Sequence, residues 1–270
     1  MTCRICNSPV QKYLHKNGYD ILRCVRCGFG QVSVTAAEIS AFYDKAYFGG
    51  EKANFAQEED SEISPSYRYW IDRQLDRLPA SGTVRVLEIG PGLGGPIAGY
   101  IQRQHPRVEF SCIEISKYAS ERLVARGFTV HCGGVSDAAA VEGWRSNFDL
   151  IYGTEVIEHD PDPRAFVRTV HDMLKPGRWA AFTTGNLDGL MARWKRESWY
   201  YIDPPAHVSY YTPKAVRHAF GTEGFDQVRA MRYGFRHIDA KLKTHLPGLL
   251  VLTHLANTAT GINITARRSL

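Results

Sequence analysis

Four of the six cysteines fall within the first 27 residues, in the pattern C-x2-C-x17-C-x2-C. Two thiolates on one tight turn supply half of a tetrahedral coordination shell, and a second turn beside it supplies the other half. The segment between the two pairs predicts a hairpin that turns at Asn17-Gly18. Two disulfides are disfavoured because the chain starts without an export signal, and a thioredoxin-type redox pair would occur singly. We therefore predict one zinc ion, held by Cys3, Cys6, Cys24 and Cys27.

The role predicted for this zinc is structural, because four protein thiolates leave no open coordination position for a substrate. The other two cysteines, Cys112 and Cys132, have no partner at ligand spacing. A free cysteine behaves as a small apolar residue. We expect both of them to be buried in the core.

A second group of chemically suggestive residues surrounds the glycine-rich segment 88–95, which reads EIGPGLGG. Glycines at 90, 92 and 94 let the backbone turn sharply and approach a ligand closely, although a plain strand-to-helix turn would also use them. The spacing is G-x-G-x-G rather than the dinucleotide G-x-G-x-x-G. Glu88 precedes the turn and could hold a cationic amino group. Glu114 ends the next apolar segment, where a carboxylate could accept hydrogen bonds from a ribose diol.

Alternating strands and helices beyond residue 81 would position these side chains. Such alternation predicts a mostly parallel sheet covered by helices on both faces, with ligands at the carboxyl ends of its strands. The apolar pattern predicts strands at 84–89, 108–113, 128–132, 148–152, 179–183, 227–233 and 261–266. It predicts helices at 67–78, 97–104, 117–126, 164–174 and 246–256.

With these segments in order, the sequence resembles the class I S-adenosylmethionine-dependent methyltransferases. The matching pieces are residues 88–95, 113–114, 148–152, 155–163 and 174–177. The resemblance implies a Rossmann-like, seven-stranded, mostly parallel α/β sheet and S-adenosylmethionine as the cofactor. It implies cofactor binding by Glu88, Gly90, Pro91, Gly92, Gly94, Glu114, Ile115, Gly134, Val135 and Gly153.

The resemblance also implies which part of the cofactor each residue meets. Glu88 meets the methionine amino group by way of the loop, residues 90–94 back the methionine portion, and Glu114 binds the ribose. The adenine lies near Ile115 and the Gly134-Val135 turn.

The N-terminal cysteine module is similar to that of short zinc-ribbon methyltransferases of small-molecule and cell-surface sugar pathways. Sugar C-methyltransferases with such a module have a Glu-His pair before an aromatic-rich segment. Here His207 is retained and Ala206 replaces the Glu. This difference disfavours keto-sugar C-methylation and leaves a hydroxyl as the expected acceptor.

Methyl transfer to a hydroxyl is assisted by a base that removes its proton, and the near-neutral pKa of histidine suits that task. His159 and His207 are the predicted catalytic residues. A different possibility is a divalent metal, because Glu155, Glu158 and His159 match a ligand pattern of ubiquinone-pathway O-methyltransferases and small-RNA 2′-O-methyltransferases. His207 is then a candidate for a further ligand, and the metal would acidify a bound hydroxyl. Proximity of the two substrates alone is the third possibility.

Three regions are expected along the chain: a zinc ribbon at 1–34, a helical linker or lid at 35–80, and a methyltransferase domain at 81–270. An aromatic insertion at about 186–213 lies within the third region and contains Arg193, Lys195 and Arg196. These basic side chains could bind a phosphate or carboxylate group of the acceptor, or could simply form the solvated face of a helix.

Composition narrows the function classes. The chain has 33 Lys+Arg against 28 Asp+Glu, a formal net charge of +5, and 44% hydrophobic residues, which is ordinary globular composition. Its longest apolar run is too short to span a bilayer, so we expect a cytoplasmic protein. The leading expectation is methyl transfer to a small molecule, namely a sugar, glycolipid precursor or specialised metabolite. An RNA methyltransferase that holds RNA with the ribbon is the alternative, disfavoured by the lack of a basic stripe. The oligomeric state is not indicated.

Overall fold

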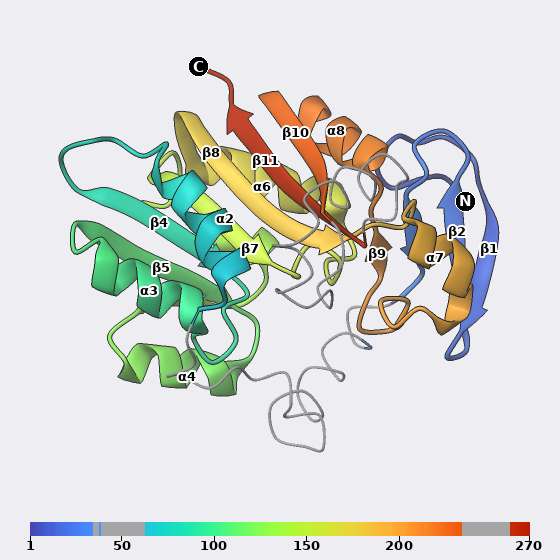
Figure 1. Cartoon of the computed structure of the whole chain (residues 1–270), viewed down its shortest axis with the longest axis horizontal. Helices are drawn as coiled ribbons and strands as arrows, with labels where there is room; N and C mark the ends of the chain where they lie inside the picture. The colour runs from blue at the N-terminus through green and yellow to red at the C-terminus, as the bar shows by residue number, and fades with distance from the viewer. Residues whose placement is uncertain (35–37, 39–62, 234–259) are drawn as a thin grey trace, which may run out of the picture.

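The computed structural model describes residues 1–34, 38, 63–233 and 260–270. These residues form a seven-stranded sheet and a smaller four-stranded sheet (Figure 1). The larger sheet has the order β10-β11-β8-β7-β4-β5-β6. Its strands are β4 (Val84–Ile89), β5 (Val108–Glu114), β6 (Thr129–Cys132), β7 (Phe148–Thr154), β8 (Leu174–Gly185), β10 (Phe225–Tyr233) and β11 (Gly261–Arg268).

Most of the larger sheet is parallel, as the sequence predicts. β4 pairs in parallel with β5 and β7, and the parallel pairing continues to β6 and β8. β11 runs antiparallel to both β8 and β10. The carboxyl ends of β4, β5 and β7 therefore meet at one edge of the sheet, where this class of fold binds ligands.

Helices cover both faces of this sheet because its strands are apolar on both sides. In β4, Val84 and Val86 pack with one core cluster, whereas Leu87 and Ile89 pack with the other, as the alternation of a strand requires. The first face is covered by α2 (Pro65–Leu75), α3 (Pro96–Gln104) and α4 (Lys117–Ala125). The second face is covered by α5 (Val135–Ala138), α6 (Pro163–Met173) and α8 (Pro213–Thr222).

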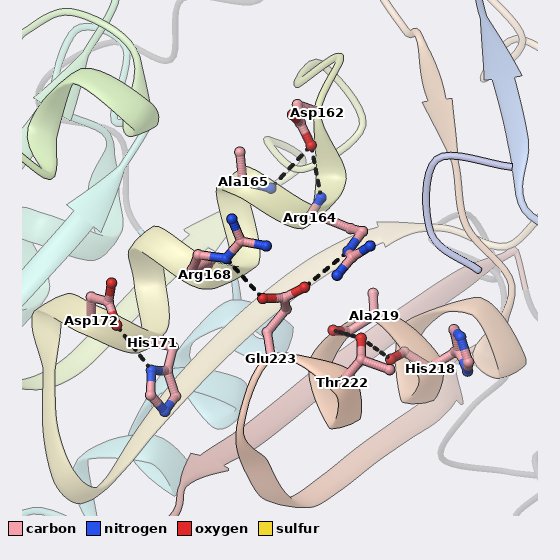
Figure 2. A network of polar contacts seen from close by, with 10 residues as sticks. All are labelled: Asp162, Arg164, Ala165, Arg168, His171, Asp172, His218, Ala219, Thr222 and Glu223. Atoms are coloured by element: carbon pink, nitrogen blue, oxygen red, sulfur yellow. Dashed lines mark hydrogen bonds and ion pairs between the residues drawn. The ribbon is translucent and has the colours of Figure 1, made fainter. Parts of the chain in front are cut away.

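A buried carboxylate ties α6 to α8 (Figure 2). Glu223 follows α8 and accepts hydrogen bonds from Nε of Arg164 and Nε of Arg168, at 2.9 and 3.0 Å. Asp162 begins α6 by accepting from the backbone N–H groups of Arg164 and Ala165. The start of α6, which follows the loop after β7, is therefore held by its N-cap and by the two arginines that bind Glu223.

The smaller sheet has the order β1-β2-β3-β9. It contains β1 (Val10–Lys16), β2 (Tyr19–Cys24), β3 (Gly30–Val32) and β9 (Ser209–Tyr210). The predicted hairpin is confirmed: Asn17 and Gly18 link β1 to β2 with φ of 53° and 83°, the left-handed pair that a tight hairpin turn needs. Its fourth strand, β9, comes from the distant segment that follows α7 (Leu190–Lys195).

Two expectations about single residues have different outcomes. Cys112 lies on β5 and is fully buried, as predicted. The prediction for Cys132 is wrong, because its side chain is exposed. β6 is an edge strand of the sheet, so within the described residues its last residue has a neighbouring strand on one side only.

The remaining expectations lie partly outside the described residues. The helix expected at 246–256 is outside them, as is most of the linker or lid at 35–80. The described part of that linker is residue 38 and residues 63–80, which include α2. Within the described ranges, no helix has the length and hydrophobicity that a bilayer-spanning segment needs.

Candidate active site

The glycine turn after β4 has a backbone conformation that residues with side chains rarely adopt. Gly90, Gly92 and Gly94 have φ of 68°, 60° and 87°, in the left-handed region. A Cβ atom on Gly90 would lie 2.8 Å from Cγ2 of Val156. The loop after β7, which contains Val156, therefore packs directly against the glycine turn.

An arginine from a neighbouring helix end holds this turn. Nη1 of Arg126, the residue that ends α4, donates to the carbonyl oxygens of Leu93 and Gly94 at 2.7 and 3.1 Å. A Cβ atom on Gly94 would collide with this guanidinium. Nothing in the sequence pattern identifies Arg126, because the contact depends on how α4 packs beside the turn.

Glu114 lies at the tip of β5 and binds the same turn. Its Oε2 accepts from the N–H of Gly92 at 2.9 Å, and its Oε1 accepts from the N–H of Ser116 at 2.8 Å. Burial raises the pKa of Glu114 to about 7, while these N–H donors act in the opposite direction. The carboxylate is thus oriented by the loop that it supports.

Glu88 lies one strand away, on β4, and is also buried. Burial raises its pKa to about 8, against the smaller effect of Tyr152. Among the described residues, Oε2 of Glu88 has no hydrogen-bond partner. A buried carboxylate with an unsatisfied oxygen favours the arrival of a cationic group.

The other residues implied by the resemblance lie around this edge of the sheet. Ile115 follows Glu114 and is 47% exposed, whereas Val135 is buried at the start of α5 and Gly134 caps that helix. A Cβ atom on Gly153 of β7 would lie 2.9 Å from the carbonyl oxygen of Ile89, so these two strands approach closely. Pro91 is half-buried within the turn.

These groups match the parts of S-adenosylmethionine in kind. A buried carboxylate suits an ammonium group, a second carboxylate suits a ribose diol, and an exposed isoleucine suits an adenine ring. The turn that links them has three left-handed glycines, which leave its backbone accessible. The residues at this edge of the sheet therefore fit the cofactor.

The two predicted catalytic histidines are adjacent. The ring centroids of His159 and His207 lie 4.7 Å apart. Nδ1 of His159 is 2.8 Å from the carbonyl oxygen of Ala206, and Nδ1 of His207 is 2.7 Å from that of Tyr201. A carbonyl oxygen can only accept, so each Nδ1 carries a proton and each neutral ring has its lone pair on Nε2.

Burial keeps both imidazoles neutral. It lowers the pKa of His207 and of His159, and for His159 the neighbouring His207 lowers it further. The neutral form is the one that accepts a proton or binds a metal.

A buried glutamate completes a group with these histidines. Glu158 is fully buried, its Oε2 accepts from Oγ1 of Thr184 at 2.9 Å, and burial raises its pKa to about 7. Oε1 of Glu158 has no hydrogen-bond partner in the part of the chain that the structure describes. Potential ligand atoms of Glu158, His159 and His207 all lie within 4.8 Å of one another.

Glu155, which the sequence pattern includes in the metal-ligand set, lies outside this group of three. Its backbone has a φ of 53°, and its Oε1 accepts from Oγ1 of Thr183 on β8 at 2.9 Å. The structure thus brings together three of the four candidate ligands named from the sequence, Glu158, His159 and His207, and leaves Glu155 outside.

Tyr201 is a neighbour of the histidines that the sequence pattern does not single out. Its ring centroid lies 4.5 Å from that of His207, and its hydroxyl is 2.8 Å from Oγ1 of Thr184. Any side chain on Gly185 would overlap the Tyr201 ring. Gly185 therefore makes room for an aromatic wall beside the imidazoles.

The four N-terminal cysteines converge as the zinc prediction requires. Sγ of Cys6 lies 3.4 Å from that of Cys24 and 3.6 Å from that of Cys27, and Cys3 and Cys27 are also 3.6 Å apart. Tetrahedral zinc with Zn–S bonds of about 2.3 Å separates its sulfurs by roughly 3.8 Å. Sγ of Cys24 also accepts from the N–H groups of Arg26 and Cys27. The cluster fits a zinc ion.

Comparison with known proteins identifies the chain's relatives. Residues 59–230 match a family model described as "Methyltransferase domain". Ubiquinone biosynthesis O-methyltransferase of Thiobacillus denitrificans is 32% identical over 158 residues, which cover 57% of this chain and 65% of that protein. The same-named protein of Paracidovorax citrulli is 31% identical over 128 residues, covering 46% and 52%. The chain thus spans half to two thirds of the length of these curated relatives.

Solved structures share the fold. An S-adenosylmethionine-dependent methyltransferase from Archaeoglobus fulgidus has a TM-score of 0.56 at 16% identity, covering 75% of this chain and 93% of that one. Phosphoethanolamine N-methyltransferase 2 of Haemonchus contortus, in complex with S-adenosylhomocysteine, has a TM-score of 0.60 at 17% identity, covering 89% and 63%. The expected Rossmann-like fold is confirmed. None of these named relatives supports the RNA alternative.

Proposed function

The chain belongs to the methyltransferase-domain family, and from that premise we propose that it transfers a methyl group from S-adenosylmethionine to a hydroxyl group of a small molecule. A sugar, a glycolipid precursor or a specialised metabolite would serve as the acceptor. The observation that carries this proposal is the packing of Val156 against Gly90. This packing supports the proposal because the loop that contains Val156 also contains His159, so this histidine would lie near a cofactor bound at the glycine turn.

S-adenosylmethionine, when bound, supplies an electrophilic methyl group on a sulfonium centre. Glu88 would face its ammonium group and Glu114 its ribose, while the glycine turn would approach the methionine portion. Nε2 of His207 would accept the acceptor's proton as the oxygen attacks, because Nδ1 is already committed to the carbonyl oxygen of Tyr201. Tyr201 and Trp199, whose rings stack with centroids 5.1 Å apart, would wall off water.

A divalent metal at Glu158, His159 and His207 is the alternative mechanism. It is favoured by the convergence of their ligand atoms within 4.8 Å. It is also favoured by Oε1 of Glu158, which has no hydrogen-bond partner among the described residues. One carboxylate and two imidazoles suit a divalent ion, which would lower the pKa of a bound hydroxyl. The two histidines would then be ligands rather than bases. The zinc at the four N-terminal cysteines stays structural in either mechanism.

Calorimetric titration with S-adenosylhomocysteine tests the cofactor site. Replacement of Glu114 by alanine removes charge-assisted bonds of ~1.5–3 kcal/mol and should weaken binding about tenfold or more. Glu109, an exposed carboxylate on the same strand, offers a matched control in Glu109→Ala. Unchanged affinity in Glu114→Ala would remove Glu114 from the site.

Transfer of a radiolabelled methyl group tests the acceptor class. The probes are a monosaccharide, a nucleoside-diphosphate sugar, 3,4-dihydroxybenzoate and bulk RNA. We expect label on a small hydroxyl probe and none on RNA. Label on RNA alone would contradict the proposal, and so would a protein that binds no S-adenosylhomocysteine.

A further inference from the structure

The third strand of the cysteine ribbon pairs with the segment that contains His207. Gly30 is opposite Tyr210 and Gln31 is opposite Ser209 in the antiparallel β3–β9 pair. The N–H of Val32 extends this ladder by donating to the carbonyl oxygen of Val208 at 3.0 Å. In Figure 1, β9 accordingly lies between the ribbon and the larger sheet.

The other side of the same segment is bonded to the loop of Glu158 and His159. The N–H groups of Val208 and Ser209 both donate to the carbonyl oxygen of Glu158, at 2.9 and 3.0 Å. Oγ of Ser209 donates to the carbonyl oxygen of Asp160 at 2.7 Å. The segment at 206–210 is therefore held between the ribbon and the loop that contains Glu158 and His159.

The cysteine turns add two further bonds to these segments. Oγ1 of Thr212 donates to the carbonyl oxygen of Cys27 at 2.8 Å. Nη1 of Arg4 donates to the carbonyl oxygen of Pro161 at 3.1 Å. Phe29, between the second cysteine pair and β3, packs its ring 5.2 Å from that of Tyr211. Backbone, side-chain and aromatic contacts thus all join the ribbon to this side of the site.

The position of residues 206 and 207 determines the orientation of both imidazoles. The carbonyl oxygen of Ala206 holds Nδ1 of His159, and His207 is fixed through Nδ1 to Tyr201. A strand as short as β9, with two residues, has little stability of its own and depends on its partner.

We propose that β3 is a positioning element of the active site: by pairing with β9, the ribbon fixes the Nδ1-protonated tautomers of His159 and His207. The catalytic importance of these tautomers rests on the proposed function, whereas the positioning itself does not. The ribbon thereby supports one side of the active site, and its four-cysteine cluster holds β3 in place against β9.

Gly30 is the place to separate β3 from β9 without touching a cysteine or a histidine. A Cβ atom there would lie 2.9 Å from Cδ2 of Leu187 and 3.1 Å from Cβ of Tyr210. The Gly30→Val variant would therefore act as a wedge. Gly221→Val is the matched control, because a Cβ atom on Gly221 meets nothing within 4 Å in the described structure.

The readouts require no acceptor. Long-range 1H–15N spectra of 15N-histidine protein at pH 8 report which ring nitrogen carries the proton, and His159→Gln and His207→Gln assign the signals. In Gly30→Val we expect both histidines to lose the fixed Nδ1–H pattern and amides 206–211 to exchange about tenfold faster. Zinc content and S-adenosylhomocysteine affinity should stay as in wild type. Gly221→Val should match wild type in every readout.

Two results would overturn this proposal. One is an unchanged Nδ1–H pattern in Gly30→Val while β3 amides exchange faster, which would show that the wedge works and the histidines do not depend on it. The other is an equal loss of the Nδ1–H pattern in Gly221→Val, which would show that the loss does not come from separating β3 from β9. Should Gly30→Val fail to fold, Gly30→Ala adds a single Cβ atom, with Gly221→Ala as its control, and the same criteria apply. The tautomer, exchange and zinc readouts remain valid if the proposed function fails, because they involve neither methyl transfer nor the cofactor.

Discussion

The imidazoles of His159 and His207 meet edge to face, with an interplanar angle of 76° and a centroid separation of 4.7 Å. Each ring is held through Nδ1 by a backbone carbonyl from the segment 201–206. Burial lowers the pKa of both rings, and the neighbouring His207 lowers the pKa of His159 further. Two neutral imidazoles are therefore the resting state of the site.

Replacement of His207 separates the base mechanism from the alternatives. His207→Ala should lower kcat by about 10²–10⁴-fold, typical for loss of a general base, with unchanged affinity for S-adenosylhomocysteine. Because the pKa of His207 lies below its ordinary 6.5, the wild-type kcat at saturating cofactor should be constant from pH 8 to 7 and fall only at lower pH. Under the metal mechanism, Glu158→Ala and His159→Ala would be as inactive as His207→Ala, and activity would need added divalent cation. Near-normal turnover of both histidine variants would favour proximity alone.

Glu88 should make cofactor binding pH-dependent. Without ligand its pKa is about 8, so the carboxyl group is largely protonated at pH 7. An ammonium group beside it favours the carboxylate, so binding should release a proton, and affinity for S-adenosylhomocysteine should increase from pH 6 to pH 8. Calorimetry in two buffers of different ionisation enthalpy measures this proton. Glu88→Gln should abolish the release, and a release that persists in this variant would assign the proton to another group.

The strands and the glycine turn could be predicted because their signals are local. The apolar stretch 84–89 matches β4 at both ends, and the glycines at 90, 92 and 94 have the left-handed backbone that their spacing suggests. The cysteine pattern predicts the cluster equally well, since each pair sits on its own turn. Local periodicity and turn chemistry suffice in these places.

The remaining parts of the site depend on contacts between distant segments. β9 has two residues and exists through its pairing with β3, about 180 residues away in the chain. Arg126 and Tyr201 reach the site because of how α4 packs and because Gly185 leaves space. The expected burial of Cys132 failed for the same reason, because only the strand order shows that β6 is an edge.

Arg126 should support the cofactor site without touching the chemistry. Arg126→Met leaves two carbonyl oxygens of the glycine turn without their donor, at a cost of about 1–3 kcal/mol if they stay buried. We expect affinity for S-adenosylhomocysteine to fall by about tenfold and kcat at saturating cofactor to change little. Arg103→Met, on the exposed face of α3, is the control and should bind as wild type. Equal affinities in the two variants would show that the turn holds its shape unaided.

Zinc removal should affect the ribbon and its immediate neighbours only. Elemental analysis should find one zinc per chain, and Cys24→Ser should lose it, whereas Cys132→Ser, outside the cluster, should retain it. Cys3, Cys27 and Phe29 share a core cluster with α8. We therefore expect faster amide exchange in residues 1–32, β9 and the start of α8, with the strands β4, β5 and β7 still protected. Zinc-free protein with full ribbon protection would show that packing alone maintains the ribbon.

The clamp between α6 and α8 should contribute to global stability. Glu223 is 7% exposed at its side chain, whereas Arg164 and Arg168 are 37% and 58% exposed, so solvent weakens both ion pairs. Burial acts to raise the pKa of Glu223, but Arg168 and Arg164 together lower it below its ordinary 4.5. A lowered folded-state pKa means that this stabilisation is present above pH 4.5 and is lost as the pH falls through the folded value. Glu223→Gln should therefore reduce the free energy of unfolding by about 1 kcal/mol at pH 7, and the difference from wild type should vanish in acid. Urea titrations at pH 7 and at several pH values below 4.5 measure the difference, and Glu197→Gln, on the exposed segment after α7, is the control. A difference that stays constant as the pH falls would show that packing rather than charge gives Glu223 its role.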